Sequence, residues 1–139
     1  MPLLDDAGAI RDLLSRTRTI AVVGASTDPG RPSHGISLYL ARAGYRVIPV
    51  NPTLMGRSLA GEPFRASLAA IQEPVDIVDV FRRPDAVPAL VEEAVAAGAP
   101  ALWLQLGVGH PDAVRRAVAA GLAVVAERCI SVDHRRLMG

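Results

Sequence analysis

Residues 19–26 read TIAVVGAS, and this stretch decides the fold. It is a continuous apolar run, rich in β-branched residues, that ends in a glycine, a small residue and a hydroxyl. That pattern is typical of a buried parallel strand leading into a ligand-binding loop. Four further runs have the same character, at residues 47–50, 76–80, 101–104 and 122–125. Because none of them alternates with polar residues, we expect strands that are covered on both faces.

Segments with helical spacing separate these runs. Their apolar period and their flanking prolines and glycines predict helices over 5–16, 34–43, 84–97 and 111–120, with a shorter one over 67–71. The alternation predicts an α/β fold, a three-layer Rossmann-like domain with helices on both faces of a five-stranded parallel sheet of order 3-2-1-4-5. Pro49 lies inside the second run, so we expect an edge position or the end of the strand there. Residues 1–139 are expected to form this one domain.

Composition excludes several classes of protein. Of the 139 residues, 50% are hydrophobic and 21% are charged, with a formal net charge of +1. All basic residues are arginines in blocks of at most two, which argues against a nucleic-acid-binding surface. Cys129 is the single cysteine, so no intrachain disulfide is expected, and no apolar stretch reaches the roughly 20 residues of a membrane span. We expect a cytoplasmic protein without a signal peptide or a membrane association.

The most informative loop follows the first strand, at residues 24–35. Ligands of open α/β sheets bind beyond the carboxyl ends of the strands, and this loop enters a helix with Ser33 as the expected N-cap. The helix N-terminus favours an anion, and Arg31 and Ser26 can add donors. The loop has neither the P-loop motif nor a compact G-x-G-x-x-G, which argues against a P-loop ATPase. The alternative is a plain connection, but the length of the loop favours ligand binding.

The next two loops are open to two interpretations each. Asn51 follows the second strand where NAD-binding domains usually carry an acid, which argues against ordinary NAD binding. It either contacts a ligand or starts a turn before Pro52. Phe81, Arg82 and Arg83 can hold an adenine ring and neutralise phosphate, or they are a half-buried ring with two solvated arginines.

The fourth loop carries Gln105, which can both donate and accept, and Gly107 and Gly109, which allow close approach of a backbone. It can equally be a glycine-rich turn. The usual catalytic constellations are absent, because the three histidines are scattered and neither a zinc-site spacing nor a G-x-S-x-G motif occurs. Cys129, after the fifth run, is either a reactive thiol or a small buried apolar residue.

Several motifs along the chain carry a family resemblance. They are VVGAS at 22–26, RPS at 31–33, VNP at 50–52, PVDIVDVFRR at 74–83, WLQLGV at 103–108, and AGL at 120–122 with ERCI at 127–130. Together, over about residues 19–134, they resemble the small stand-alone CoA-binding protein family. That family is similar to the N-terminal CoA-binding domain of the succinyl-CoA synthetase α subunit. The resemblance implies a Rossmann-like sheet with CoA lying across the strand ends.

The resemblance also implies roles for the loops. Ser26 and residues 32–35 would hold the phosphates, residues 51–53 would approach the adenosine, 81–83 would line the adenine and 105–107 would face the pantetheine arm. The complete set of expected CoA-binding residues is Gly24, Ala25, Ser26, Arg31, Pro32, Ser33, His34, Gly35, Asn51, Pro52, Thr53, Phe81, Arg82, Arg83, Gln105, Leu106 and Gly107.

Two departures from the synthetase matter. The synthetase has a lysine soon after its second strand, where this chain has Thr53, so the contact to the ribose phosphate must come from elsewhere or be weaker. Its phosphorylated histidine belongs to a following domain, and His134 is not that residue. Neither the ligation chemistry nor the nucleotide-binding partner subunit is therefore expected here.

The expected function is binding of coenzyme A or acyl-CoA without a catalytic apparatus or a metal, as a carrier, a sensor or a partner module. The alternative is an NAD(P)-binding enzyme or redox sensor on the same fold, in which arginines accept the 2′-phosphate of NADP. A homodimer or another protein partner is compatible with either.

Overall fold

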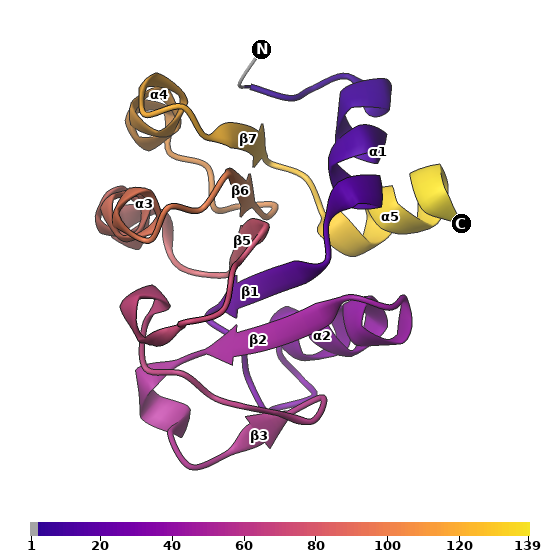
Figure 1. Cartoon of the computed structure of the whole chain (residues 1–139), viewed down its shortest axis with the longest axis vertical. Coiled ribbons are helices and arrows are strands. Elements are labelled where there is room, and N and C mark those ends of the chain that lie inside the picture. Colours follow the sequence, from indigo (N-terminus) through magenta and orange to yellow (C-terminus); the bar gives the residue numbers. More distant parts are fainter. Residues whose placement is uncertain (1–2) are drawn as a thin grey trace.

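The computed structural model describes residues 3–139, and its centre is a parallel sheet of five strands (Figure 1). In spatial order these are β2 (Arg46–Val50), β1 (Thr19–Val23), β5 (Ile77–Val80), β6 (Ala101–Leu104) and β7 (Ala123–Ala126). Every neighbouring pair is parallel. The predicted Rossmann-like α/β class is confirmed, because each apolar run forms a strand in which at least half of the residues are buried.

The strand order is set by the connection that leads from β2 to β5. Beyond β2, Arg65 forms only an isolated parallel bridge with Val50, so β2 is the outermost strand on this side of the five-stranded sheet. The prediction, however, put residues 76–80 in that outer position, whereas β5 pairs with β1. The connection makes only a short antiparallel hairpin of β3 (Ser58–Leu59) and β4 (Glu62–Pro63) before it crosses to the other side of β1. The gap between β1 and β5 is therefore the switch point at which ligands bind in such sheets.

Five α-helices cover the sheet, α3 and α4 on one face and α1, α2 and α5 on the other (Figure 1). They are α1 (Ala7–Arg16), α2 (Pro32–Arg42), α3 (Val87–Ala96), α4 (Pro111–Ala119) and α5 (Ile130–Met138). The segment predicted as a short helix forms a 3₁₀ helix over Leu68–Ala70, and a second 3₁₀ helix, Pro84–Ala86, precedes α3. None of the helices in residues 3–139 is both long enough and apolar enough to cross a membrane.

The core consists of two layers that alternate along each strand. On β5, Val78 and Val80 pack toward α3 and α4, whereas Ile77 packs toward α1, α2 and α5. On β6, Leu102 joins the first layer and Trp103 the second, and both are fully buried. Successive side chains of a strand point to opposite faces of the sheet, and here helices cover both faces. Residues of both kinds are therefore apolar, which explains why the runs in the sequence are continuous.

Both edges of the sheet are partly covered by other backbone. At the β2 edge, the Arg65 N–H donates to the Pro49 carbonyl (2.9 Å) on the side of β2 that faces away from β1. The N–H that proline lacks would point to this same outer side, so its absence removes no hydrogen bond between β2 and β1. The prediction of an edge position for this proline is confirmed. At the β7 edge, the Leu4 N–H donates to the Val124 carbonyl (2.7 Å), next to a parallel bridge between Leu3 and Val124.

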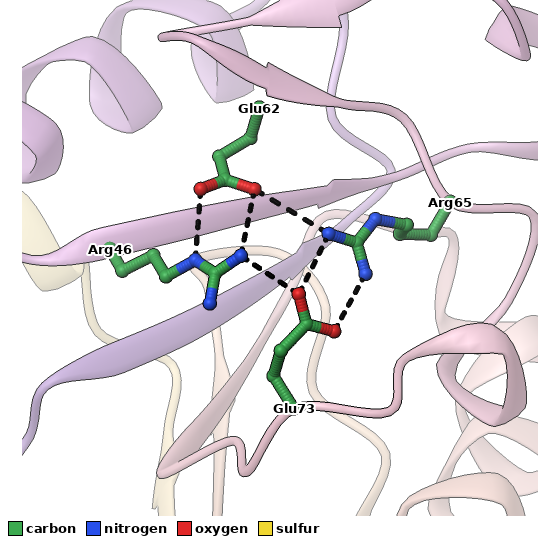
Figure 2. Close-up of polar contacts among 4 residues, drawn as sticks. All are labelled: Arg46, Glu62, Arg65 and Glu73. Atoms are coloured by element: carbon green, nitrogen blue, oxygen red, sulfur yellow. Dashed lines mark hydrogen bonds and ion pairs between the residues drawn. The ribbon is translucent and has the colours of Figure 1, made fainter.

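Four charged side chains fasten the irregular segment after β2 to the sheet (Figure 2). Arg46 contacts Glu62 (2.9 Å) and Glu73 (2.8 Å), and Arg65 contacts Glu73 (2.9 Å). The hydrogen bond from Arg65 is the main cause that lowers the pKa of Glu73, to about 2. A network of this kind stabilises more than an isolated surface pair does.

The ion network makes a prediction about acid stability. Because folding lowers the pKa of Glu73 from 4.5 to about 2, its carboxylate stabilises the fold above about pH 4.5, and this contribution disappears as the pH falls toward 2. Glu73→Gln should therefore reduce the free energy of unfolding at pH 7 much more than at pH 3, measured by urea denaturation. Glu93→Gln is the control, since Glu93 forms no ion pair within residues 3–139. Equal losses at both pH values would contradict the prediction.

Candidate functional site

The loop after β1 begins with a glycine that no other residue can replace without movement. Gly24 has φ of +89°, and a Cβ at this position would lie 2.2 Å from the carbonyl oxygen of Phe81 at the end of β5. Its N–H donates to the Val50 carbonyl at the end of β2 (3.0 Å). Gly24 therefore lets the ends of three strands meet closely at the switch point.

Short hydrogen bonds then shape the loop into α2. The Ser26 hydroxyl accepts from the Asp28 N–H (3.0 Å), and the Asp28 carboxylate accepts from the Gly30 N–H (2.9 Å). His34 Nδ1 donates to the Ser26 carbonyl (3.0 Å), which ties the first turn of α2 back to the loop. These contacts hold the helix N-terminus beside the strand ends.

Helix α2 starts two residues earlier than the sequence suggested. Arg31 is the N-cap residue of α2, and its side chain makes no capping bond. Ser33 as N-cap was wrong, because Pro32 takes the first helical position, where its fixed φ and missing N–H are tolerated. Ser33 lies inside the helix and is 3% exposed.

Asn51 joins the first loop to the second. Its Nδ2 donates to the Ala25 carbonyl (3.0 Å), and its Oδ1 accepts from the N–H and the hydroxyl of Thr53 (3.0 and 2.7 Å). Asn51 thereby also caps the 3₁₀ helix Pro52–Leu54. The turn-forming interpretation of this residue is confirmed.

A cleft of about 560 Å³ opens between the N-terminus of α2 and the ends of β1, β5 and β6. The expected site residues that line it are Gly24, Arg31, Pro32, Ser33, Phe81, Arg82, Arg83, Gln105, Leu106 and Gly107. Those outside its lining are Ala25, Ser26, His34, Gly35, Asn51, Pro52 and Thr53. The cleft is also lined by four residues that were not expected, namely Ile36, Pro84, Val108 and Cys129.

A smaller hollow of about 250 Å³ adjoins this cleft at the ends of β1 and β2. It is lined by Pro52 and Ser67 among others, and it shares Arg82 with the cleft. A further hollow of about 460 Å³ lies at the opposite edge of the sheet, around Asp76 and Pro100. That edge carries the amino ends of the strands, and the Asp76 carboxylate already accepts from the backbone N–H groups of Arg18 and Thr19.

Positive charge gathers at the mouth of the cleft. Arg31, Arg82 and Arg83 are all exposed. Arg83 lies 3.4 Å from the exposed carboxylate of Asp85. In the part of the chain that the structure describes, Arg31 and Arg82 form no ion pair. Their charges are therefore available to an anionic ligand.

The inner end of the cleft is lined by uncharged residues whose neighbours are held by hydrogen bonds. Gln105 is 5% exposed, and its Oε1 accepts from the Ile130 N–H (3.2 Å). Trp103 Nε1 donates to the Arg128 carbonyl (2.8 Å), while Arg128 pairs with the buried Asp133 (2.6 Å). These contacts fix the corner between β7 and α5.

Cys129 sits at that corner as the N-cap residue of α5, half-buried in the cleft wall. Burial alone would raise the pKa of its thiol. The Ser131 hydroxyl (Sγ to Oγ 3.3 Å), the nearby Val132 N–H and the Gln105 side chain outweigh burial and lower the pKa of the thiol.

Asp79 is a buried acid that the sequence reasoning missed. It is fully buried on β5, opposite Trp103 on β6, and neither carboxylate oxygen has a hydrogen-bond partner within residues 3–139. Burial, and to a lesser extent the neighbouring charge of Cys129, raise its pKa well above the usual value. An acid in the middle of a continuous apolar strand run was the signal that could have found it.

The carboxyl group of Asp79 should cost stability at neutral pH. Because folding raises its pKa, the folded state is favoured below about pH 3.8, and this advantage is lost as the pH rises through the folded-state pKa. Asp79→Val should therefore raise the free energy of unfolding at pH 8 by about 1–3 kcal/mol, and by less at pH 4. Denaturation in guanidinium at the two pH values measures this difference. Asp76→Ala, which removes a satisfied acceptor, should destabilise instead. A loss of stability in Asp79→Val at both pH values would contradict the prediction.

Within the described chain, no group of three or more His, Cys, Asp or Glu side chains could hold a metal ion. The lining of the cleft contains none of the acidic residues and no histidine. Its chemistry is therefore cationic at the mouth and neutral inside, with one thiol.

Several known proteins are similar to this chain in sequence and in fold. A family model described as "CoA binding domain" matches residues 18–135. The "Uncharacterized protein YneT" of Bacillus subtilis (strain 168) is 40% identical over 125 residues, which cover 90% of this chain and 91% of that protein. The structure of "cell-free ID.343 from Thermus thermophilus" superimposes with a TM-score of 0.92 at 46% identity, covering 95% and 98% of the two chains. A dinucleotide-forming acetyl-coenzyme A synthetase of Ca. Korarchaeum cryptofilum matches with a TM-score of 0.69 at 26% identity, over 78% of this chain and 26% of that one.

Proposed function

Because this chain belongs to the CoA binding domain family, we propose that it binds coenzyme A in the cleft at the ends of β1, β5 and β6. The observation that carries the proposal is the division of the cleft into a cationic mouth and a neutral interior. Coenzyme A has the same division, with phosphates at one end and an uncharged pantetheine arm at the other. The arginines at the mouth of the cleft match the phosphates, and the uncharged interior matches the pantetheine arm. This division favours coenzyme A over a small ligand that is charged or uncharged throughout.

Each part of the ligand has a corresponding part of the cleft. The phosphates lie against the N-terminus of α2 and the guanidinium of Arg31, where backbone N–H groups and the helix dipole favour anions. The adenosine end extends past Phe81 toward the hollow that Arg82 and Pro52 line. The pantetheine arm lies along Gln105 and Gly107. In this arrangement Asn51 and His34 act indirectly, by holding the two loops in position.

The proposed role is that of a binding module, as a carrier, a sensor or a partner for another protein. The lining of the cleft in the described chain offers no pair of carboxylates or histidines for general acid–base catalysis, which supports a role in binding. A free thiol in the wall suits a reducing compartment such as the cytoplasm.

Calorimetric titration of the nucleotide-stripped protein tests the proposal. Coenzyme A should bind with a micromolar or lower Kd, and dephospho-CoA should bind about tenfold or more weakly, since a charge-assisted phosphate contact is worth about 1.5–3 kcal/mol. NADPH and ATP are the comparison ligands. Binding of NADPH without binding of CoA would favour an NADP-linked redox function instead. If none of the four ligands gives a heat of binding, the proposal that the protein binds a nucleotide is contradicted.

A further inference from the structure

We propose that Cys129 is a thiol–disulfide exchange site that takes up CoA covalently from CoA disulfide. The proposal rests on the proposed function, because the cleft must first hold the CoA portion of the disulfide. It adds a reaction to a module that would otherwise only bind.

The position of the thiol is the first argument. Cys129 lines the same cleft as Gln105 and Gly107, the residues proposed to face the pantetheine arm, and it is only half-buried. Gln105 also accepts a hydrogen bond from the N–H of Ile130, the residue directly after the cysteine. The reactive end of the ligand and the thiol are therefore brought to the same wall of the cleft.

The surroundings of the thiol favour its reactive form. Cys129 caps α5, a helix of nine residues, so the sulfur lies at the positive end of the helix dipole. The Ser131 hydroxyl and the backbone N–H of Val132 lie within hydrogen-bonding reach and lower the pKa of the thiol. A thiolate held by such donors, and accessible from solvent, is the nucleophile in exchange reactions.

Asp79 is the second and independent observation. This fully buried carboxyl has no partner within residues 3–139, and it lies near enough to Cys129 for the two charges to interact. Burial raises the pKa of Asp79, which favours its neutral form and so weakens its repulsion of a thiolate at Cys129. An unsatisfied buried acid costs stability, and a functional role in the adjoining cleft accounts for it.

The exchange balances without another reactant. The Cys129 thiolate attacks one sulfur of CoA disulfide, the S–S bond of that disulfide breaks, and a mixed disulfide between Cys129 and CoA forms. The second CoA leaves as its thiolate and takes a proton from water. No net oxidation occurs, and free CoA or another thiol reverses the step.

Intact-mass measurement tests the proposal, since Cys129 is the only cysteine in the chain. Incubation with CoA disulfide should add one CoA per chain, and dithiothreitol should remove it. Glutathione disulfide at the same concentration should react at least about tenfold more slowly, because it gains nothing from the cleft. An excess of desulfo-CoA, which has no thiol, should slow the reaction with CoA disulfide.

Calorimetry with CoA under reducing conditions separates the two proposals. Binding of CoA together with no adduct, or with equal rates for the two disulfides, overturns the exchange site and leaves the proposed function standing. Absence of binding in the same protein overturns both.

A pair of variants tests the contribution of the donors around the thiol. Ser131→Ala should slow adduct formation several-fold and move the pH midpoint of thiol alkylation upward, because it removes a hydrogen bond to the sulfur. Val132→Ala is the matched control, since it changes an exposed side chain and keeps the backbone N–H. Identical rates and midpoints in both variants would overturn the assigned role of Ser131 and, with it, the activated thiol.

Discussion

Arg82→Ala is expected to weaken CoA binding by about 10- to 150-fold. The guanidinium of Arg82 is exposed, borders both the cleft and the adjoining hollow, and has no carboxylate partner within the described residues. A charge-assisted contact to phosphate contributes about 1.5–3 kcal/mol, and 1.4 kcal/mol corresponds to a factor of ten in Kd. Calorimetric titration with CoA at low and high salt measures both the loss and its electrostatic origin.

Alanine variants of the three arginines at the mouth of the cleft should not all weaken CoA binding equally. Arg31→Ala should resemble Arg82→Ala, whereas Arg83→Ala should have a smaller effect because Asp85 already neutralises part of its charge. Arg11→Ala on α1 is the control, since Arg11 is exposed and does not line the cleft. Unchanged affinity in all three cleft variants would overturn the proposed position of the phosphates.

Gly24→Ala should lower the free energy of unfolding by about 2–6 kcal/mol and abolish CoA binding. Alanine at φ of +89° costs about 1–3 kcal/mol, and its Cβ would meet the Phe81 carbonyl at 2.2 Å, which adds about 1–3 kcal/mol of overpacking. Relief of that contact would separate β1 from β5, two of the three strands whose ends border the cleft. Guanidinium denaturation and calorimetry measure the two effects.

Gly121→Ala is the matched control for this variant. Gly121 has φ of +94°, but a Cβ there would meet nothing within 4 Å. Only the backbone cost of about 1–2 kcal/mol should remain, with CoA binding unchanged. If the two variants unfold at the same denaturant concentration, the close approach between Gly24 and Phe81 does not exist in solution.

The sequence predicted the strands well because burial on both faces leaves an unbroken apolar run in the chain. It predicted α1 and α4 for a similar reason, since each has an apolar stripe between clear stop signals. It missed α5, which is short and largely polar and starts at a cysteine that makes no capping bond. Local pattern also could not place β5 beside β1, because that choice depends on how much strand the segment after β2 forms.

The candidate site was predictable to the extent that strand ends predict it. Gly24, Arg82 and Gln105 follow three strands that meet at one edge, so their presence in one cleft follows from topology. The interaction between Asp79 and Cys129 does not follow from topology. The two residues are fifty positions apart in the chain, and β6 lies between β5, which carries Asp79, and β7, which precedes Cys129. Only the three-dimensional arrangement brings the buried acid within electrostatic reach of the thiol.

The covered edges of the sheet bear on self-association. A free edge strand presents a row of unpaired N–H and C=O groups on which strands from other copies can align and polymerise. Here Pro49 and the Arg65 backbone interrupt that row beside β2, and Leu3 and Leu4 interrupt it beside β7. The backbone segments that end the pairing within one molecule therefore leave fewer unpaired groups on which a strand of a second molecule could align.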